Sequence, residues 1–207
     1  MCISATLKII ALLKNIVVFA SGSGTNFQSI IDAVNRGILP ARIAGLVTNK
    51  AGIPAIQRAR KANIPVRVLN PAEFSNNESY ANQLLNQLQE WKTDLIVLAG
   101  YLRKIPAEIV RHFPKRILNI HPALLPKYGG KGFYGSKVHE AVIEAGDKET
   151  GCTVHIVTNN FDEGPILAQA KVEVLENDSP DELAQRVLKQ EHKLLPEVIK
   201  QYLLTLK

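Results

Sequence analysis

The sequence predicts an α/β fold built on a mostly parallel sheet, and three observations indicate it. Short apolar runs alternate with segments of helical periodicity through residues 14–100. One run, "LIVLA", is continuously apolar, which is typical of a strand that helices bury on both faces. The first run ends in a glycine-rich turn that leads directly into a helical pattern, which is the expected opening of a parallel α/β sheet.

The N-terminal part alternates strand and helix. The predicted strands are 14–22, 41–49, 64–69 and 94–100, and the predicted helices are 25–37, 53–63 and 79–91. In the first helix Phe27, Ile30, Ile31 and Val34 share one face, and Gly37 ends the pattern. We expect these residues to form a Rossmann-like nucleotide-binding half, residues 14–100.

The C-terminal part follows a different pattern. After Pro106 a short helix precedes a strand at 116–122, and a glycine-rich segment leads to a helix at 136–146. The runs 152–158 and 166–174 have a short connection, which suggests antiparallel pairing. A long amphipathic helix at 180–203 follows, with Pro196 expected to kink it. Residues 14–207 are therefore predicted to share one mixed sheet in a single domain, with residues 101–207 as its second half.

Length and charge limit the function. A chain of 207 residues suits one α/β domain. The net charge of +6 comes from 25 Lys and Arg against 19 Asp and Glu, and the basic residues are scattered, which favours small anionic substrates over nucleic acid. Lys8 and Lys14 break the N-terminal apolar residues into pieces shorter than the ~20 residues of a membrane span, so no membrane partner is expected. Residues 1–13 are interpreted as an appended tail or extra turn, with a degraded targeting segment as the alternative.

Cysteine usage indicates neither a disulfide framework nor a metal site. Cys2 and Cys152 lie far apart, without metal-ligand spacing to each other or to histidine. We expect no metal and a reducing, cytoplasmic location. Cys152 and His155 are interpreted as packing residues of a strand, which leaves no credible nucleophile.

The glycine turn "SGSGTN" (21–26) lies between the first strand and the first helix. Backbone N–H groups and the helix dipole converge at such a point and favour an anion. Phe27 stands where a dinucleotide fingerprint needs glycine, and Asn49 and Lys50 stand where it needs an acid, so NAD binding is disfavoured. Gly22, Gly24, Thr25 and Asn26 therefore predict a monophosphate cradle, the alternative being glycines that only permit a tight turn.

Two polar residues stand at the end of the strand in "NIHPALLP" (119–126). Asn119 and His121 are two apart, so they project to the same side and can converge on one substrate atom. Histidine is suited to proton transfer near neutral pH. Asp162, in the connection "NNFDEGP", is a third candidate, which near His121 would raise the pKa of the imidazole. A capping Asn, a packed His and an ordinary turn Asp remain the alternatives, because these residues alone do not place Asp162 near His121.

A set of longer motifs resembles the phosphoribosylglycinamide formyltransferase family, the folate-dependent transformylases of purine synthesis. They are "VVFASGSGTNFQSII", "VTNKAG", "IVLAGYLRKI", "RILNIHPALLPKYGGKG", "GCTVHIVTNNFDEGPILAQAKVEV" and "RVLKQEHKLLPEVI", in order over about residues 14–203. The resemblance implies the formyltransferase fold, with about seven strands and a catalytic and folate-binding second half. It implies direct transfer of the formyl group of 10-formyltetrahydrofolate, the cosubstrate, to the amine of glycinamide ribonucleotide.

The resemblance also implies roles for residues of the matching motifs. Asn119, His121 and Asp162 would be catalytic, with protonated His121 and the Asn119 amide stabilising an oxyanion. Gly24, Thr25 and Asn26 would hold the phosphate of the ribonucleotide, and Glu191 its ribose hydroxyls. The segment "YLRKI" would contact the folate through its residues Leu102, Arg103 and Ile105, and the loop 157–162, beginning with Val157, would close over the pteridine.

Two departures qualify these expectations. Asn76 and Asn77 stand where some relatives have an arginine, so no contact to the folate tail is predicted there. The segment 127–137 is longer than in some members and rich in glycine, so it is expected to be a lid or a connecting loop.

Three rival functions remain. A formyltetrahydrofolate deformylase gives the formyl group to water, and a methionyl-tRNA formyltransferase gives it to tRNA; the sequence offers no room for the extra domain that each usually carries. A non-catalytic nucleotide-binding module has the same kind of fold without the chemistry. The predicted monophosphate cradle favours a small phosphorylated acceptor. The protein is expected to be a monomer or a homodimer.

Overall fold

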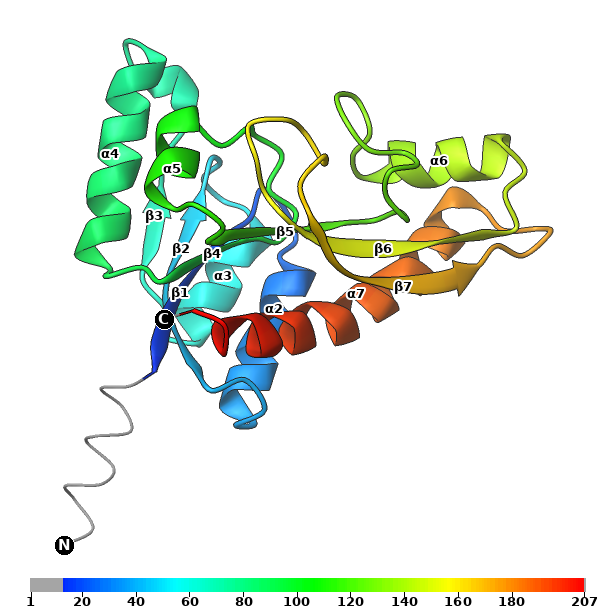
Figure 1. Cartoon of the computed structure of the whole chain (residues 1–207), viewed down its shortest axis with the longest axis horizontal. Helices are drawn as coiled ribbons and strands as arrows, with labels where there is room; N and C mark the ends of the chain where they lie inside the picture. The colour runs from blue at the N-terminus through cyan, green and yellow to red at the C-terminus, as the bar shows by residue number, and fades with distance from the viewer. Residues whose placement is uncertain (1–12, 207) are drawn as a thin grey trace, which may run out of the picture.

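The computed structural model describes residues 13–206, whose strands form one seven-stranded sheet in the order β3-β2-β1-β4-β5-β6-β7 (Figure 1). The strands are β1 (Lys14–Phe19), β2 (Ala41–Thr48), β3 (Val66–Val68), β4 (Leu95–Leu98), β5 (Ile117–His121), β6 (Glu149–Ile156) and β7 (Ile166–Glu173). The first five strands pair in parallel, whereas β5 with β6 and β6 with β7 are antiparallel. The predicted mixed, mostly parallel sheet of about seven strands is confirmed, including the antiparallel tail.

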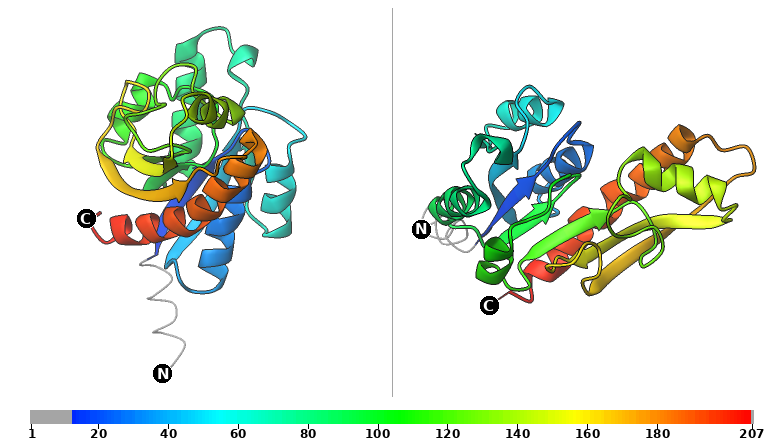
Figure 2. Two further views of the ribbon diagram at one scale, coloured as in Figure 1. Left: turned by 90° about the vertical axis from the view of Figure 1, so that its right-hand side faces the viewer. Right: turned by 90° about the horizontal axis from the view of Figure 1, so that it is seen from above.

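Helices cover both faces of the sheet (Figures 1 and 2). They are α2 (Thr25–Asn35), α3 (Pro54–Lys61), α4 (Asn77–Glu90), α5 (Ala107–His112), α6 (Ser136–Glu144) and α7 (Pro180–Leu203), with a 3₁₀ turn η1 (Pro71–Glu73) before α4. In β1, Ile16 and Val18 pack in the core with α2, α3 and α7, whereas Val17 and Phe19 pack with α4 and α5 on the opposite face. Burial on both faces is why this strand is continuously apolar.

The antiparallel tail sets which residues of β5 and β6 stand opposite each other. In the register of this pair Asn119 faces His155 and His121 faces Thr153. The connection from β6 to β7, residues 157–165, begins beside the start of β5, because β6 runs opposite to β5 and its last residue, Ile156, pairs with Leu118. From there it folds back along β5 and brings Asp162 to Asn119 and His121, which sequence alone does not establish.

Three expectations need adjustment or stay open. Helix α7 continues through Pro196 without interruption, and this proline is buried. The expectation for residues 1–13 falls, apart from Leu13, outside the described residues, and the division of the domain at residue 100 stays a prediction. Within residues 13–206, no helix combines the length and the apolar content needed to cross a membrane.

Candidate active site

The glycine loop joins β1 to α2 and lines a cleft of about 760 Å³. Gly24 precedes α2 with a left-handed backbone, φ 69°. A Cβ at this position would lie 2.7 Å from the Cβ of Ala55 in α3, so both conformation and space require glycine. Thr25 and Asn26 begin α2, where backbone N–H groups have no partner within the helix. The loop can therefore offer N–H donors to an anion.

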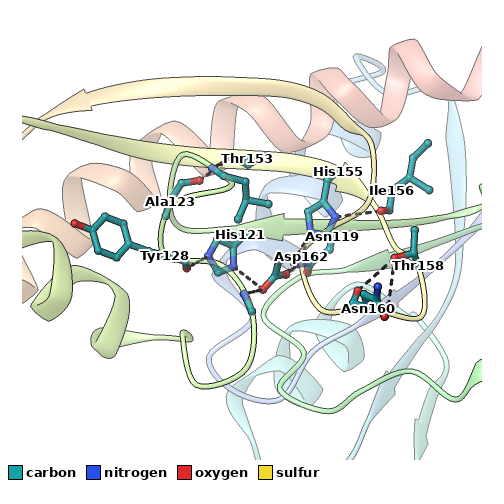
Figure 3. Close-up of polar contacts among 12 residues, drawn as sticks. Asn119, His121, Ala123, Tyr128, Thr153, His155, Ile156, Thr158, Asn160 and Asp162 are labelled. Atoms are coloured by element: carbon teal, nitrogen blue, oxygen red, sulfur yellow. Dashed lines mark hydrogen bonds and ion pairs between the residues drawn. The ribbon is translucent and has the colours of Figure 1, made fainter.

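The predicted pair at the end of β5 lines the same cleft. Asn119 and His121 point to one side of the strand (Figure 3), whereas Leu118 and Ile120 between and beside them pack in the core on the other side. The His121 side chain is largely buried, with about 4% of the residue exposed. Alternation along β5 thus brings the amide and the imidazole together, as the spacing predicts.

Hydrogen bonds from the neighbouring strands hold the chain that follows His121. The Thr153 hydroxyl donates to the Ala123 carbonyl at 2.6 Å and accepts from the Leu125 N–H at 3.1 Å. Gln169 donates to the Leu125 carbonyl at 3.0 Å and to the Thr153 hydroxyl at 2.8 Å. This buried network fixes the loop after β5 from the β6 and β7 side, so the polar pair stands on a rigid support.

Asp162 meets this pair from the β6–β7 connection (Figure 3). Its Oδ2 lies 3.7 Å from His121 Nδ1 and accepts the Gly130 N–H at 3.0 Å, and its Oδ1 lies 3.4 Å from Asn119 Nδ2. The backbone of Asp162 is left-handed, φ 55°, a conformation that aspartate tolerates better than most residues. The structure therefore brings Asn119, His121 and Asp162 into one cluster.

The hydrogen bonds of His121 assign its titrating nitrogen. Nε2 lies 2.7 Å from the Tyr128 carbonyl oxygen, which only accepts, so Nε2 carries hydrogen and Nδ1 is the nitrogen that gains or loses a proton. Burial lowers the pKa of His121, although the Asp162 carboxylate acts in the opposite direction. Asp162 thus raises the pKa of His121, as predicted, but desolvation outweighs the carboxylate and the net shift is downward.

The carboxylate itself stays ionised. Burial alone would raise the pKa of Asp162, but hydrogen bonding at the carboxylate, to which the Gly130 N–H donates, and the charge that His121 carries when protonated lower it below its usual value. The site thus pairs a neutral imidazole at rest with a permanent negative charge. A proton arriving at Nδ1 of His121 would be stabilised at once by the carboxylate 3.7 Å away.

His155 belongs to this cluster, which corrects its interpretation as a packing residue. Its Nε2 lies 3.0 Å from Asn119 Nδ2 and 3.4 Å from Asp162 Oδ1, and its ring lines the cleft. Its Nδ1 lies 3.1 Å from the Ile156 carbonyl, so Nδ1 donates and Nε2 is free to accept from Asn119. The signal was available in the sequence, because Cys152 and His155 have opposite parity along one strand and therefore cannot share the packing environment of one face.

Glu191, on α7, contacts the glycine loop through Asn26 and lines the same cleft. Its carboxylate accepts from Asn26 Nδ2 at 2.7 Å, and only about 5% of the residue is exposed. Burial raises the pKa of Glu191, and the bond from Asn26 only partly offsets this. The structure therefore brings together two of the residues predicted to bind the ribonucleotide, one at the phosphate loop and one on the last helix.

The residues predicted to contact folate also line the cleft: Leu102, Arg103, Ile105 and Val157. Leu102 is about half exposed and Ile105 is buried. The Leu102 N–H donates to the Ser21 hydroxyl at 2.9 Å, which in turn donates to Asn49 Oδ1 at 2.6 Å. This buried bridge ties the segment 102–105 to the start of the glycine loop. Asn76, which stands in the region where some relatives have an arginine, is the N-cap of α4.

The glycine-rich segment 127–137 passes beside the cluster. It supplies the Tyr128 carbonyl to His121 and the Gly130 N–H to Asp162, and several of its residues line the cleft. Lys127 pairs with Asp147 at 2.7 Å, which ties the start of the segment to the turn after α6. Its role as a lid stays a prediction.

Covalent catalysis finds no support around the cleft. Cys152 is fully buried, and burial raises the pKa of its thiol to about 12, so it is not a thiolate near neutral pH. Among residues 13–206, no group of three or more His, Cys, Asp or Glu side chains is arranged to hold a metal ion.

Comparison with known proteins identifies the family. The family model described as formyl transferase matches residues 14–199. A phosphoribosylglycinamide formyltransferase of Haemophilus influenzae is 44% identical over 188 residues, which cover 91% of this chain and 86% of the relative. A crystal structure of glycinamide ribonucleotide transformylase 1 from Symbiobacterium toebii aligns with a TM-score of 0.87 and 39% identity, covering 92% of this chain and 87% of that one.

The plant relatives are longer proteins. The chloroplastic phosphoribosylglycinamide formyltransferase of Arabidopsis thaliana is 47% identical over 187 residues, which cover 90% of this chain and 64% of the relative. The chain thus spans less than two thirds of the length of this relative. Since the family model covers most of the chain and the bacterial relative is matched over nearly its whole length, the chain belongs to the phosphoribosylglycinamide formyltransferase family.

Proposed function

We propose that the chain transfers the formyl group of 10-formyltetrahydrofolate to the amine of glycinamide ribonucleotide, a step of purine synthesis. One observation carries the proposal: Asn119, His121 and Asp162 meet in a cleft that is also lined by the glycine loop and by the segment 102–105. A phosphorylated acceptor, a folate donor and a proton-transfer group can therefore be held in one space.

The acceptor would bind at the glycine loop. Backbone N–H groups of Gly24, Thr25 and Asn26 would hold its phosphate, helped by the positive end of the α2 dipole. Glu191, which lines the cleft beside Asn26, would accept hydrogen bonds from the ribose hydroxyls. A buried carboxylate suits this role because hydroxyl donors offset the cost of its burial.

The donor would lie against the segment that follows β4. Leu102, Ile105 and Val157 provide apolar surface in the cleft for the pteridine, and the Arg103 guanidinium suits a carboxylate of the glutamyl tail. The loop 157–162, which begins with Val157 and ends with Asp162, would lie over the donor. In this arrangement the formyl carbon of the donor would face the amine of the acceptor, near the polar cluster.

The reaction needs one carbon–nitrogen bond made and one broken. The amine of the ribonucleotide attacks the formyl carbon, the carbonyl oxygen becomes an oxyanion, and collapse of the tetrahedral intermediate releases N10 of the folate. The amine loses one proton and N10 gains one, so a single group that accepts and then donates a proton satisfies the balance.

His121 is the side chain proposed for this transfer. It is neutral at rest, so Nδ1 can accept the proton that the amine loses, directly or through a water molecule held by Asp162. The resulting imidazolium lies beside Asp162 and stabilises the oxyanion, whose own charge raises the affinity of Nδ1 for the proton. Return of the proton to N10 completes the cycle without a covalent enzyme intermediate.

Asn119 would donate to the same oxyanion, but its amide hydrogens are engaged in the cluster. The bond to His155 at 3.0 Å is the shorter one, and the contact with Asp162 Oδ1 at 3.4 Å is long. Donation to a substrate oxygen therefore requires that the contact with Asp162 be given up, while His155 holds the amide in place. His155 is thus a positioning residue for Asn119.

The test is formyl transfer by the purified protein from 10-formyltetrahydrofolate, or from a dideaza analogue, followed by the folate absorbance change with and without glycinamide ribonucleotide. Product that forms only with the ribonucleotide supports the proposal. Product without it indicates a deformylase, and no product in either case favours a binding module. A cytoplasmic location, a monomer or homodimer, and the absence of nucleic-acid and membrane partners stay predictions.

A further inference from the structure

The glycine loop has two edges, one toward the cleft and one toward its neighbouring helices. Three successive carbonyls of the loop accept hydrogen bonds on the helix side. The Gly22 carbonyl accepts the Ala55 N–H at 3.2 Å, the Ser23 carbonyl accepts Arg58 Nε at 2.9 Å, and the Gly24 carbonyl accepts the Gln28 N–H at 2.9 Å. Two of these donors are backbone groups, but the middle one is a side chain.

These three bonds fix the directions of the N–H groups that follow. In a planar trans peptide the carbonyl and the next N–H point in opposite directions. The N–H groups of Ser23, Gly24 and Thr25 therefore point away from the helices. All three residues line the cleft, and none of these N–H groups donates to an acceptor within residues 13–206.

Arg58 is itself held in a fixed orientation. Its Nη1 donates to Gln28 Oε1 at 3.1 Å, and Gln28 Nε2 donates to Asp32 Oδ1 at 2.9 Å. The guanidinium thus links α3, α2 and the Ser23 carbonyl by two bonds from its planar fork. An ammonium group cannot reproduce both bonds with this geometry.

We propose that Arg58 is a positioning residue for the phosphate of the acceptor, acting by orienting the Ser23–Gly24 peptide so that the Gly24 N–H points into the cleft. The inference deepens the proposed function and rests on it. Without Arg58 this peptide is free to rotate next to a glycine, the residue with the widest backbone freedom. The phosphate would then have to order the loop as it binds, which lowers its affinity.

The test compares the dissociation constants of glycinamide ribonucleotide and of the corresponding ribonucleoside without phosphate, measured by calorimetry. The dissociation constant of the ribonucleoside divided by that of the ribonucleotide isolates the contribution of the phosphate to binding. Arg58→Ala should lower this ratio about tenfold, the typical effect of one hydrogen bond to a charged group. Arg58→Lys should also lower this ratio at least several-fold. The positive charge is kept, but an ammonium group cannot form both hydrogen bonds of the planar guanidinium.

Arg60→Ala is the matched control. Arg60 lies on the same helix, is exposed, and its side chain forms no hydrogen bond or ion pair with the rest of the described chain. It should leave the ratio unchanged, and all variants should keep the affinity for folate within about twofold. An unchanged ratio in Arg58→Ala, or full recovery in Arg58→Lys, would overturn the inference. Equal losses for nucleotide, nucleoside and folate would mean a general structural role and would overturn it as well.

A second measurement separates this inference from the proposed function. Inorganic phosphate is titrated into nitrogen-15-labelled protein, and the amide signals of Gly24 and Thr25 are followed. Shifts in the wild type that are lost in Arg58→Ala support the inference even if the protein transfers no formyl group. No shift in the wild type, or equal shifts in both, would contradict it.

Discussion

Replacement of Asp162 by asparagine should remove the charge that stabilises protonated His121 while keeping the shape of the side chain. The two groups lie 3.7 Å apart, and the Asp162 side chain is 12% exposed. At this distance, with an effective dielectric constant of about 20, one charge pair is worth about 4 kcal/mol. If the imidazolium forms in the transition state, kcat should fall roughly a thousandfold.

The effect should be specific to turnover. The Michaelis constants of both substrates should change by less than about threefold, because the Asp162 carboxylate contacts the catalytic cluster and asparagine keeps the shape of the side chain. Steady-state kinetics with both substrates varied measure this split. Glu163→Gln is the matched control, since Glu163 is the exposed neighbour in the same loop and bonds only to Asn160 in the described chain.

The pH dependence gives a second readout. The neutral form of His121 is needed to accept a proton, so kcat should fall as the pH drops below the pKa of His121. Asp162 acts to raise that pKa, so its removal should shift this acid limb to lower pH. A loss of turnover below about tenfold, a comparable rise in a Michaelis constant, or an unmoved acid limb would refute the reasoning.

Three further substitutions test other parts of the site. His121→Ala should lower kcat at least ~100-fold, as removal of a proton-transfer or oxyanion group usually does; retained turnover would exclude His121 from the mechanism. Gly24→Ala should raise the Michaelis constant of the ribonucleotide at least ~tenfold, because φ is 69° and the new Cβ would meet Ala55, whereas Gly22→Ala, with no atom within 4 Å of its Cβ, should have a smaller effect. Because burial raises the pKa of Glu191, the wild type should lose stability as the pH rises above 4.5 through that raised pKa. Glu191→Gln should gain melting temperature relative to the wild type over that range and bind the ribonucleotide more weakly; a pH-independent difference would contradict the buried carboxylate.

The sheet and its helices could be predicted from the sequence because their signals are local. Alternation along β1 between two cores produces the apolar run, and Gly24 marks the turn where β1 gives way to α2. The pair Asn119 and His121 could be predicted in the same way, since two residues along a strand return to one face. Each of these inferences depends on spacing within one element.

The rest depends on contacts between distant segments. Asp162 reaches His121 because the connection after β6 starts beside the beginning of β5 and folds back along it, and the resemblance to a family, not the spacing, suggested this contact. The protonation of His121 depends on burial that several elements create together, so its net direction could not be predicted. His155 could have been assigned to the site by strand parity once its pairing with Asn119 was considered.

The central claim is that the cluster in the cleft passes a formyl group directly from the folate to a phosphorylated amine. The most direct test follows carbon-13 from labelled 10-formyltetrahydrofolate by NMR, with the ribonucleotide present, in the wild type and in Asp162→Asn. The account predicts that the label appears in the formamide of the ribonucleotide, and that this appearance is slowed roughly a thousandfold in the variant. Label released as formate, or transfer that proceeds equally in both proteins, would contradict it.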